Sequence, residues 1–409
     1  MSSAKILVLT SSHLCRNPRV VKEATTLGNA GYDVTVMSTV THAGFAEIDR
    51  ELARGLPFRR DLIDYSAKSG AALPRFFQRA RTWAARKLCR TLGIESAAAL
   101  GPANALLARA HAHPADLIIA HTEIPLCLAS RLIRGGKRVA VDLEDWYSED
   151  LPESDRRGRP LGLLRSAERF ALHHAAYVST PSDSIASALV ETHGGTKPIV
   201  VRNVFPLPGR VRVPPPSPYV PAFVWFSQTI GPKRGLDEFL AAWSRTQNAS
   251  RVCLIGGEHP GYREQLLGAL DPARRRDVEI VPLLTPAALT ERLTGYDIGL
   301  ALEPEEPRNR GLTTSNKLFQ YLGAGLAVVA TNTAGQIEGM RAATGAGFVV
   351  PLQDTAHFAS QLDELLGDPA RLRACQLAAR AAAERELCWE REEKRVLEAV
   401  SRALAKPQN

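Results

Sequence analysis

The sequence contains few cysteines and no long apolar run. Its six cysteines are scattered along 409 residues, and no two of them form a C-x-x-C pair. This spacing predicts reduced thiols and favours neither a disulfide framework nor a zinc site. Residues 1–10 hold only a short apolar run at 6–9, which is far below the length of a signal-peptide core or a membrane-spanning helix. We therefore expect a cytoplasmic protein.

Motifs for metal and nucleic-acid binding are also missing. None of the ten histidines lies in an H-E-x-x-H motif, and no Asp-x-Asp occurs, so the chain predicts no metal and no other cofactor. A net charge of +8 favours an anionic partner, such as nucleic acid, a phosphorylated substrate or an acidic membrane. Because the basic residues are spread along the chain without a helix-turn-helix or finger motif, we expect no nucleic-acid binding.

The length and the hydrophobic pattern predict two α/β domains. A chain of 409 residues fits two cores of roughly 200 residues each. Short apolar runs alternate twice with helix-length amphipathic stretches, which is the pattern of strands and crossover helices in parallel sheets. The predicted strands are 6–9, 34–38, 117–120, 138–141 and 177–180 in the first half, and 223–226, 252–255, 278–281, 298–302, 327–330 and 347–350 in the second.

A proline-rich stretch separates the two halves. Six prolines between positions 206 and 218 exclude both a helix interior and a sheet ladder. We therefore predict an N-terminal domain over residues 1–205, a linker over 206–221 and a C-terminal domain over 222–385. After Asp368 and Pro369 the chain is rich in alanine, arginine and glutamate, which predicts one long exposed helix to the end. Its last part, 386–409, could pack back on the N-terminal domain.

Polar residues follow three predicted strands of the first half, at the edge where open α/β sheets bind ligands. The first loop has no G-x-G-x-x-G motif, and its basic side chains either meet an anion or are solvated. His121 follows the strand 117–120 and is either a substrate contact or a structural polar residue. The acidic loop 142–150 suits sugar hydroxyls and ring faces, or simply caps a helix. The acceptor-binding candidates are His13, Arg16, Arg19, Glu144, Asp145 and Trp146.

Two segments of the second half suit a diphosphate. Residues 227–235 bring backbone N–H groups, Lys233 and Arg234 to a helix that begins near Leu236, although both cations could equally be exposed turn residues. Residues 311–322 combine a hydroxyl-rich loop with a second helix that the loop caps and that carries Lys317 in its first turn, and the glycines of 323–325 close this helix. The donor-binding candidates in these segments are Ser227, Thr229, Gly231, Thr314, Ser315, Asn316, Lys317 and Gln320.

With these segments placed, the chain resembles the GT-B glycosyltransferases of the large, mostly retaining family four over nearly its whole length. The resemblance rests on residues 5–24 and 30–36 and on the two C-terminal segments, in the right order. It implies a GT-B fold, in which two Rossmann-like, doubly wound parallel-sheet domains face a central cleft. It also implies that His121 contacts the transferred sugar and that Lys233 and Arg234 bind the donor diphosphate. Asn316 and Lys317 would line the same donor site.

Two positions depart from the pattern of that family. Thr229 stands five residues before Arg234, where the family commonly has an arginine. Gln320 stands in place of the second glutamate of a pair spaced eight residues apart, and the first position of that pair falls on Leu312. Because a glutamine carbonyl is a weaker, uncharged acceptor for a ribose hydroxyl, we expect a lower donor affinity.

The sequence therefore predicts a hexosyltransferase-type enzyme that moves a sugar from a nucleotide-diphosphate donor to an acceptor without a metal. His121, Lys233 and Arg234 are the predicted catalytic residues, and the two cations would neutralise the leaving diphosphate together with the helix start at Ser315. The resemblance implies retention and a role in polysaccharide or glycoconjugate assembly, with a glycan, lipid-linked or small-molecule acceptor. The alternatives are a nucleotide-sugar epimerase of the same fold and a non-catalytic scaffold that partners another glycosyltransferase.

One further segment has a strong amphipathic pattern. Between residues 75 and 92, apolar residues recur at helical spacing and six basic residues occupy other positions. The pattern predicts either a peripheral membrane helix, which would agree with a lipid-linked acceptor, or an ordinary helix that covers the domain.

Overall fold

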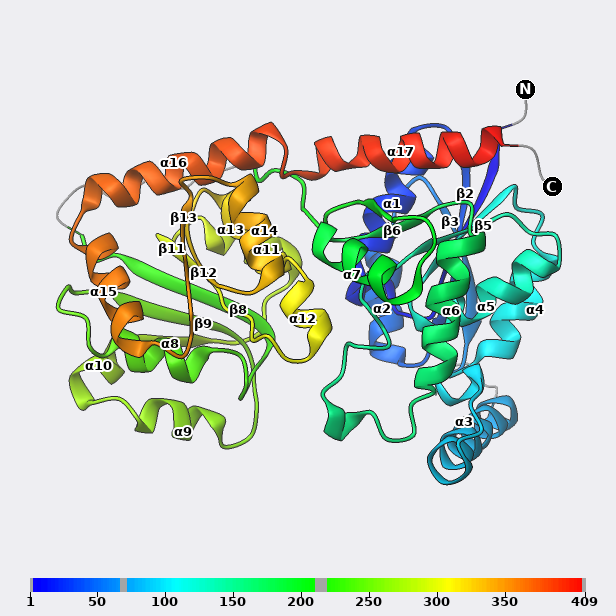
Figure 1. The fold of residues 1–409 in the computed structure, drawn as a ribbon, viewed down its shortest axis with the longest axis horizontal. Coiled ribbons are helices and arrows are strands. Elements are labelled where there is room, and N and C mark those ends of the chain that lie inside the picture. Colours follow the sequence, from blue (N-terminus) through cyan, green and yellow to red (C-terminus); the bar gives the residue numbers. More distant parts are fainter. Residues whose placement is uncertain (1–2, 67–71, 210–218, 407–409) are drawn as a thin grey trace. The chain divides into compact units, whose positions relative to one another are not determined.

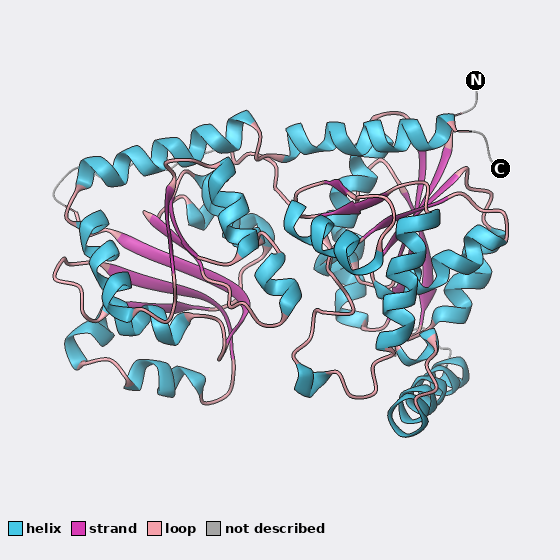
Figure 2. Ribbon diagram, in the orientation of Figure 1, coloured by secondary structure: helices cyan, strands magenta, loops and turns pink. Residues whose placement is uncertain are grey.

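The computed structural model describes residues 3–66, 72–209 and 219–406, and the chain divides into two compact units (Figure 1). Unit 1 comprises the residues up to Val201 together with those from Glu393 onward, and unit 2 comprises Arg202–Glu392. Most of the predicted linker, 210–218, lies outside the described residues. Each unit consists of helices around one parallel sheet (Figure 2), so the predicted fold class is confirmed.

Unit 1 holds a seven-stranded sheet in the order β3-β2-β1-β4-β5-β6-β7. The central strands are nearly continuous apolar runs, which is typical of parallel strands buried on both faces, and all five predicted strands are present. The strands are β1 (Lys5–Thr10), β2 (Asp33–Val40), β3 (Arg59–Asp64), β4 (Leu117–His121), β5 (Val139–Asp142), β6 (Val178–Thr180) and β7 (Ile199–Val200).

The sequence pattern missed β3 and β7, and both lie at the edges of the sheet. The β3 segment reads RRDLID, without an apolar run, and it pairs in parallel only with β2. An edge strand needs less buried surface than a central one, so backbone pairing with β2 is enough to hold a polar sequence extended. The short strand β7 pairs with β6 through two residues.

The helices of unit 1 form layers on both faces of its sheet (Figure 1). Helices α4, α5 and α6 pack side by side in one layer, while α1 and α2 lie on the opposite side of the sheet. The helices are α1 (Pro18–Asn29), α2 (Ala43–Leu52), α3 (Ala72–Leu92), α4 (Ala103–Ala112), α5 (Glu123–Arg134), α6 (Leu161–His174) and α7 (Asp183–His193).

Unit 2 repeats the architecture with a six-stranded sheet in the order β10-β9-β8-β11-β12-β13. All six predicted strands are present, and β8 runs four residues further than predicted, through a bulge between Phe226 and Thr229. Ser227 and Thr229 therefore lie on a strand and not in a loop. The strands are β8 (Ala222–Ile230), β9 (Arg251–Glu258), β10 (Val278–Val281), β11 (Ile298–Ala301), β12 (Ala327–Thr331) and β13 (Gly347–Val350).

The core of unit 2 is aromatic near β8 and α8, where the ring of Phe239 contacts the rings of Phe223 and Phe358. Helix α8 packs with α15, and α13 packs with α16. The helices are α8 (Leu236–Trp243), α9 (Tyr262–Gly268), α10 (Pro272–Arg276), α11 (Pro286–Leu293), α12 (Arg308–Leu312), α13 (Asn316–Ala324), α14 (Ala334–Ala342), α15 (Thr355–Leu366) and α16 (Pro369–Arg385).

The prediction of one continuous C-terminal helix is wrong. The helix α16 ends at Arg385, and a second helix, α17 (Trp389–Ala405), follows. Leu387 and Cys388 at the break are buried, and the backbone N–H of Trp389 donates to the carbonyl of Phe205. Burial of these apolar side chains outweighs the local helix preference. Among the described helices, none is both long and apolar enough to cross a membrane.

Candidate functional site

The candidate residues of unit 1 gather where the strand order changes direction. β1 lies between β2 and β4, so the chain reverses its course across the sheet at β1 and β4, and ligands of open α/β sheets bind at that point. The hydroxyls of Ser11, after β1, and Thr122, after β4, lie 2.8 Å apart. Thr122 adopts a φ of 68°, which is strained for a residue with a side chain. Strain of this kind is common at functional sites, and sequence reasoning gave no signal for it.

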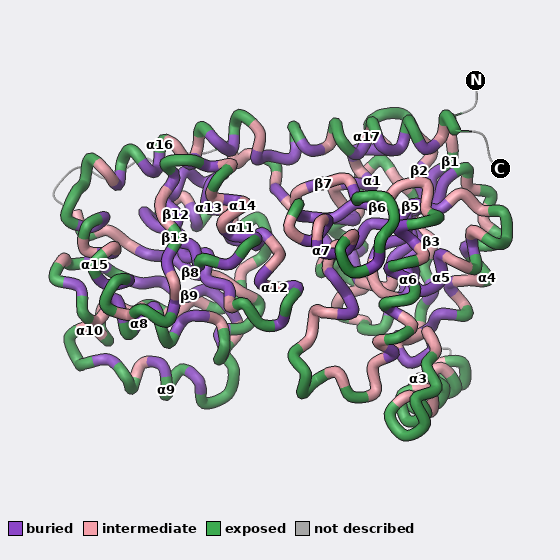
Figure 3. The backbone as a smooth tube through the Cα atoms, in the orientation of Figure 1, coloured by how far each residue is buried: buried purple, intermediate pink, exposed green. Residues whose placement is uncertain are grey.

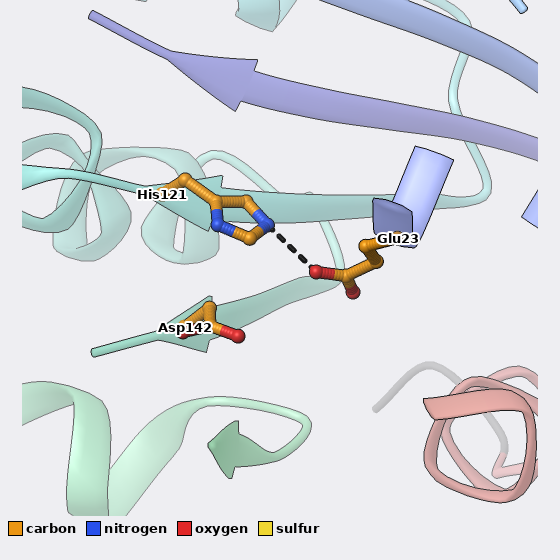
Figure 4. A group of neighbouring side chains, drawn as sticks. All are labelled: Glu23, His121 and Asp142. Carbon is orange, nitrogen blue, oxygen red and sulfur yellow. Dashed lines mark ion pairs between the residues drawn. The ribbon is translucent and has the colours of Figure 1, made fainter. Parts of the chain in front are cut away.

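A buried group of ionisable side chains lies under this edge. His121 is the last residue of β4, Asp142 is the last residue of β5, and Glu23 comes from α1 (Figure 4). The His121 ring is fully buried, and its two nitrogens lie 2.9 Å from Glu144 Oε1 and 2.9 Å from Glu23 Oε2. The contact with Glu144 is a hydrogen bond, while the contact with Glu23 is an ion pair without good hydrogen-bond alignment.

Arg19 completes this network from the first turn of α1. Its Nε and Nη2 donate to the carboxylate of Asp142 at 3.0 and 2.8 Å, and its Nη1 donates to the carbonyl of Val201 at 2.7 Å. Asn17 caps α1 with its side-chain oxygen and donates through Nδ2 to Glu144 at 2.8 Å. The network therefore ties the start of α1 to the carboxyl ends of β4 and β5. We call the group formed by Arg19, Glu23, His121, Asp142 and Glu144 the buried ion network.

The charges of this network fix the protonation of His121. Burial alone would lower the pKa of His121, but the charge of Glu23 and the hydrogen bond to Glu144 raise the pKa to about 10. The ring is therefore an imidazolium at neutral pH. Burial would likewise lower the pKa of Arg19, but the charge of Asp142 raises it above its ordinary value. Two cations thus face three carboxylates inside the domain.

Three members of the network have the spacing of metal ligands. One donor atom each of Glu23, His121 and Asp142 lies within 4.8 Å of the others. These donors already have protein partners. Arg19 forms an ion pair with Asp142, and the protonated ring of His121 forms an ion pair with Glu23. A metal needs a neutral imidazole and free carboxylate lone pairs. The group is better described as an ion network, and metal-free chemistry stays a prediction.

The structure places three of the acceptor-binding candidates inside the domain. Nδ1 of His13 donates to Asp49 at 2.9 Å, and its Nε2 accepts the backbone N–H of Thr41 at 3.2 Å. The side chain of Arg19 is buried against Asp142. Trp146 is 1% exposed, and its indole N–H donates to Glu168 at 3.2 Å. The prediction that these three side chains face an acceptor disagrees with this packing, because their polar atoms already hold the loops in place.

Other candidates remain accessible at the same edge. Arg16 is exposed, with its guanidinium 5.5 Å from the ring centre of Phe45. Glu144 and Asp145 are partly exposed at the start of the acidic loop. Carboxylates and a guanidinium of this kind can accept from and donate to sugar hydroxyls. The predicted acceptor role is therefore geometrically open to these three residues.

Asp150 was not among the sequence candidates. Burial raises its pKa to about 7, although Arg159 acts to lower it, and the charges of Glu123 and Asp145 raise it further. Arg159 Nη2 lies 3.0 Å from Asp150 and 2.9 Å from Glu123, so one cation serves two carboxylates. A carboxyl that titrates near neutral pH beside an accessible loop is a candidate acid or base.

The turn between β8 and α8 in unit 2 has an unusual backbone. Lys233 adopts a φ of 59° and Gly235 a φ of 77°. A side chain at Gly235 would come within 3.0 Å of Leu302 Cβ, the residue after β11, so glycine lets the turn close onto the neighbouring strand. Among the described residues, no carboxylate pairs with Lys233 or Arg234. Two cations without counter-ions thus stand at the start of a helix, which favours an anion.

Helix α13 lies in the connection from β11, which is the neighbour of β8 in the sheet, to β12. Lys317, in its first turn, is buried and lies 2.5 Å from Glu303 Oε1 and 5.5 Å from the ring centre of Trp225. Arg310 Nε lies 3.8 Å from the other oxygen of Glu303. Lys317 is therefore not an isolated cation, and sequence reasoning missed its partner. No motif pointed to Glu303, because it follows β11 fourteen residues earlier in the chain.

A second missed residue, Gln336, holds the loop before α13. Its Nε2 donates to Ser315 Oγ and to the carbonyl of Ala301, each at 2.9 Å, while its Oε1 accepts the backbone N–H of Ser315 at 3.3 Å. Thr314 Oγ1 donates to the carbonyl of Gly335 at 2.7 Å. A side chain at Gly335 would lie 2.3 Å from the backbone of Thr313. Ser315 and Thr314 thus position the loop through these contacts.

The remaining donor candidates are more accessible. Asn316 and Thr229 are exposed, and Gln320 and Ser227 are half-buried, while Gly231 is buried in the β8–α8 turn. Within the described parts of the chain, the Gln320 amide has no protein partner. Its carbonyl oxygen is therefore available to a ligand hydroxyl.

Two family models match the chain in tandem. Residues 17–204 match the glycosyl transferase 4-like domain, and residues 221–368 match the glycosyl transferases group 1. No curated protein sequence matches the chain.

Several solved structures share the fold at low sequence identity. Sucrose-phosphate synthase from Thermosynechococcus elongatus aligns with a TM-score of 0.70 and 14% identity, over 98% of this chain and 99% of that one. HepE from Anabaena, in complex with UDP-glucose, aligns with a TM-score of 0.67 and 16% identity, over 97% and 99%. A trehalose-6-phosphate synthase from Burkholderia multivorans aligns with a TM-score of 0.63 and 13% identity, over 99% and 98%. The two matched domains and the two doubly wound sheets lead to one conclusion: this chain belongs to the GT-B glycosyltransferases of the family-four type.

Proposed function

We propose that this protein transfers a hexose from a nucleotide-diphosphate sugar to an acceptor, with retention at the anomeric carbon and without a metal ion. The family supports sugar transfer. Among the similar structures, HepE was solved with UDP and with UDP-glucose, and one trehalose-phosphate synthase is named as UDP-forming. These names favour UDP as the nucleotide to test first. The reaction class fits polysaccharide or glycoconjugate assembly.

The observation that carries the proposal is the β8–α8 turn. Lys233 and Arg234 stand at a helix start without carboxylate partners among the described residues. Negative charge develops on the diphosphate as the sugar leaves, and two cations with backbone N–H groups stabilise that charge where other enzymes use a metal. Gln320 would accept a ribose hydroxyl, and Asn316 lies at the start of the neighbouring helix.

The buried ion network gives His121 a positioning role in this proposal. The ring of His121 is enclosed and charged, so in this proposal its ion pairs position β4, β5 and α1 relative to one another. Accessible side chains, and not His121, then contact the sugar. Glu144 links the network to the accessible loop, since it accepts from both His121 and Asn17. Glu144, Asp145 and Arg16 are the proposed acceptor contacts. Retention by same-face attack needs no protein nucleophile, and we assign none.

The test is isothermal titration calorimetry of the full chain with UDP, GDP and their common sugar conjugates, in EDTA. We expect saturable binding of one nucleotide, and a loss of about 10- to 100-fold in affinity for Arg234→Ala, because a charged hydrogen bond is removed. The matched control is Arg251→Ala, since Arg251 is exposed at the amino end of β9, on the opposite edge of the same sheet.

Three results would count against the proposal. Binding that requires added divalent metal would refute the metal-free site. Absence of binding by every nucleotide would favour the non-catalytic scaffold. Release of free nucleotide and an epimerised sugar without any acceptor would favour the epimerase.

A further inference from the structure

Helix α3 is strongly basic and carries large apolar side chains. Between Ala72 and Leu92 it contains six basic residues and no aspartate or glutamate. None of its residues is buried. Figure 3 accordingly draws α3 without any buried segment, at the end of unit 1 away from the α17 side. The basic residues are Arg75, Arg79, Arg81, Arg86, Lys87 and Arg90.

The side of α3 that faces the protein is polar or small. Half-buried residues recur every three or four positions, which marks one helical face. These residues are Arg75, Gln78, Thr82, Ala85 and Cys89, and one further half-buried residue, Ala84, lies off this face. Arg75 Nη1 donates to the carbonyl of Ser66 at 3.1 Å, and Arg86 Nε donates to the carbonyl of Ala99 at 2.8 Å. Polar contacts therefore attach the helix to the rest of unit 1.

The opposite side of α3 is apolar and open to solvent. Leu73 is 70% exposed, Phe76 64%, Phe77 65% and Trp83 65%. On a helix of 100° per residue, these four side chains lie roughly opposite the half-buried face. A helix that merely covers a domain turns its apolar face inward. α3 does the reverse, so the alternative of an ordinary covering helix does not describe it.

We propose that α3 binds an anionic lipid surface through this outward face. Aromatic and leucine side chains on one face and a dense set of cations are the features of helices that lie in the membrane interface. Arg79 and Arg81 border the apolar face, and Lys87 lies within it, with its Nζ 5.1 Å from the ring centre of Trp83. Long basic side chains there reach phosphate headgroups while the rings enter the acyl region.

The charge of the helix favours lipid over a second copy of the chain. Two α3 helices packed face to face would bring together six cations each, with no acidic residue in either helix to offset them. A surface of anionic headgroups has the charge opposite to that of α3. Because a lipid surface is fluid, it needs no complementary shape to cover the apolar face of the helix. The surface belongs to unit 1 and includes none of the residues proposed to bind the nucleotide, which belong to unit 2, so the proposal stands independently of the proposed function.

The experiment is flotation of the full chain with phosphatidylcholine vesicles, with and without phosphatidylglycerol. We expect binding to the anionic vesicles only, weakened by salt. The variant Phe76→Ser/Phe77→Ser/Trp83→Ser should lose at least about a hundredfold in affinity, because three apolar groups no longer leave water. Each of Arg79→Gln and Arg81→Gln should lose about fivefold. The control Leu283→Ser/Leu377→Ser removes two comparably exposed leucines of unit 2 and should bind normally.

Trp83 supplies a second measurement. The other four tryptophans are buried, so a blue shift of emission on adding anionic vesicles, together with quenching by brominated lipid, reports Trp83. Unchanged circular dichroism and unchanged nucleotide affinity show that the variants are folded. The proposal is overturned if the wild type does not float with anionic vesicles at low salt, or if the triple variant floats equally well. A dimer that the triple variant abolishes, without vesicle binding, would assign the face to a second copy.

Discussion

Raising the pH from 7 to 10 should remove most of the stabilisation that His121 gives to unit 1. The pKa of His121 is about 10 in the folded protein against an ordinary value of 6.5. Because the folded state raises this pKa, the stabilisation is complete below pH 6.5 and is lost as the pH rises through 10. The difference between pH 7 and pH 10 spans about three units of 1.36 kcal/mol, so the loss is about 3–4 kcal/mol.

The perturbation that isolates this effect is His121→Gln, which keeps a hydrogen-bonding side chain without the titratable charge. Its free energy of unfolding should lie below that of the wild type by about 3–5 kcal/mol near pH 7, because Glu23 and Glu144 lose their buried cation. The gap should shrink toward pH 10, where the wild-type ring is half neutral. Cysteine and tyrosine residues titrate in both proteins, so their contributions cancel in the difference.

The assay is urea unfolding followed by tryptophan fluorescence at pH 6.5, 8, 9 and 10, with wild type and variant compared at each pH. Unit 2 unfolds alike in both proteins, so the difference belongs to unit 1. His111→Gln, a change at an exposed histidine on α4, serves as control and should leave the pH profile unchanged. A gap between wild type and His121→Gln that stays constant from pH 6.5 to 10 would refute the reasoning, because His121 would then not be charged at neutral pH.

Three other substitutions test the sites. Lys233→Gly should leave the free energy of unfolding unchanged or raise it by up to about 1 kcal/mol, because glycine adopts the φ of 59° without strain. Calorimetry should nevertheless show donor binding about tenfold weaker, because the cation is lost. Gln320→Glu should strengthen binding of the nucleotide sugar by about fivefold, since a carboxylate accepts a ribose hydroxyl better than an amide, and an unchanged Kd would place the ribose elsewhere. Trp146→Phe should lower the free energy of unfolding by about 1–2 kcal/mol, because the hydrogen bond from the indole N–H to Glu168 is lost. A large rise in the acceptor KM without destabilisation would instead support the predicted acceptor-binding role of Trp146.

The sheet architecture could be predicted because each central strand has a local sequence signal, a short apolar run. Parallel strands buried on both faces must be apolar along their whole length, as β1 and β12 are. The turn that holds Lys233 and Arg234 could be placed for the same reason, since its glycine and proline residues act on their own stretch of backbone. The edge strands β3 and β7 of unit 1 and the break before α17 could not be predicted, because pairing with β2 and β6 and burial of Leu387 decide them.

The candidate site likewise contains some residues that the sequence could place and others that it could not. Lys233 and Arg234 belong to one short segment, and the sequence places both beside a helix start. Glu303 lies fourteen residues from Lys317, and Gln336 lies twenty-one residues from Ser315, so no spacing rule connects them. They meet only because β11 and β12 are neighbours in the sheet and their loops leave at the same edge.

The sequence by itself thus determined two parallel-sheet units, the cations of the β8–α8 turn and the amphipathic pattern of α3, because periodicity, glycine and proline act over a few residues. Only the tertiary structure decided which of these groups remain accessible. It enclosed His121 between two glutamates, placed Trp146 against Glu168 and turned the aromatic face of α3 outward. Burial and charge pairing join segments that are from about twenty residues apart, as Trp146 and Glu168 are, to more than a hundred, as Arg19 and Asp142 are, and local patterns carry no information about them.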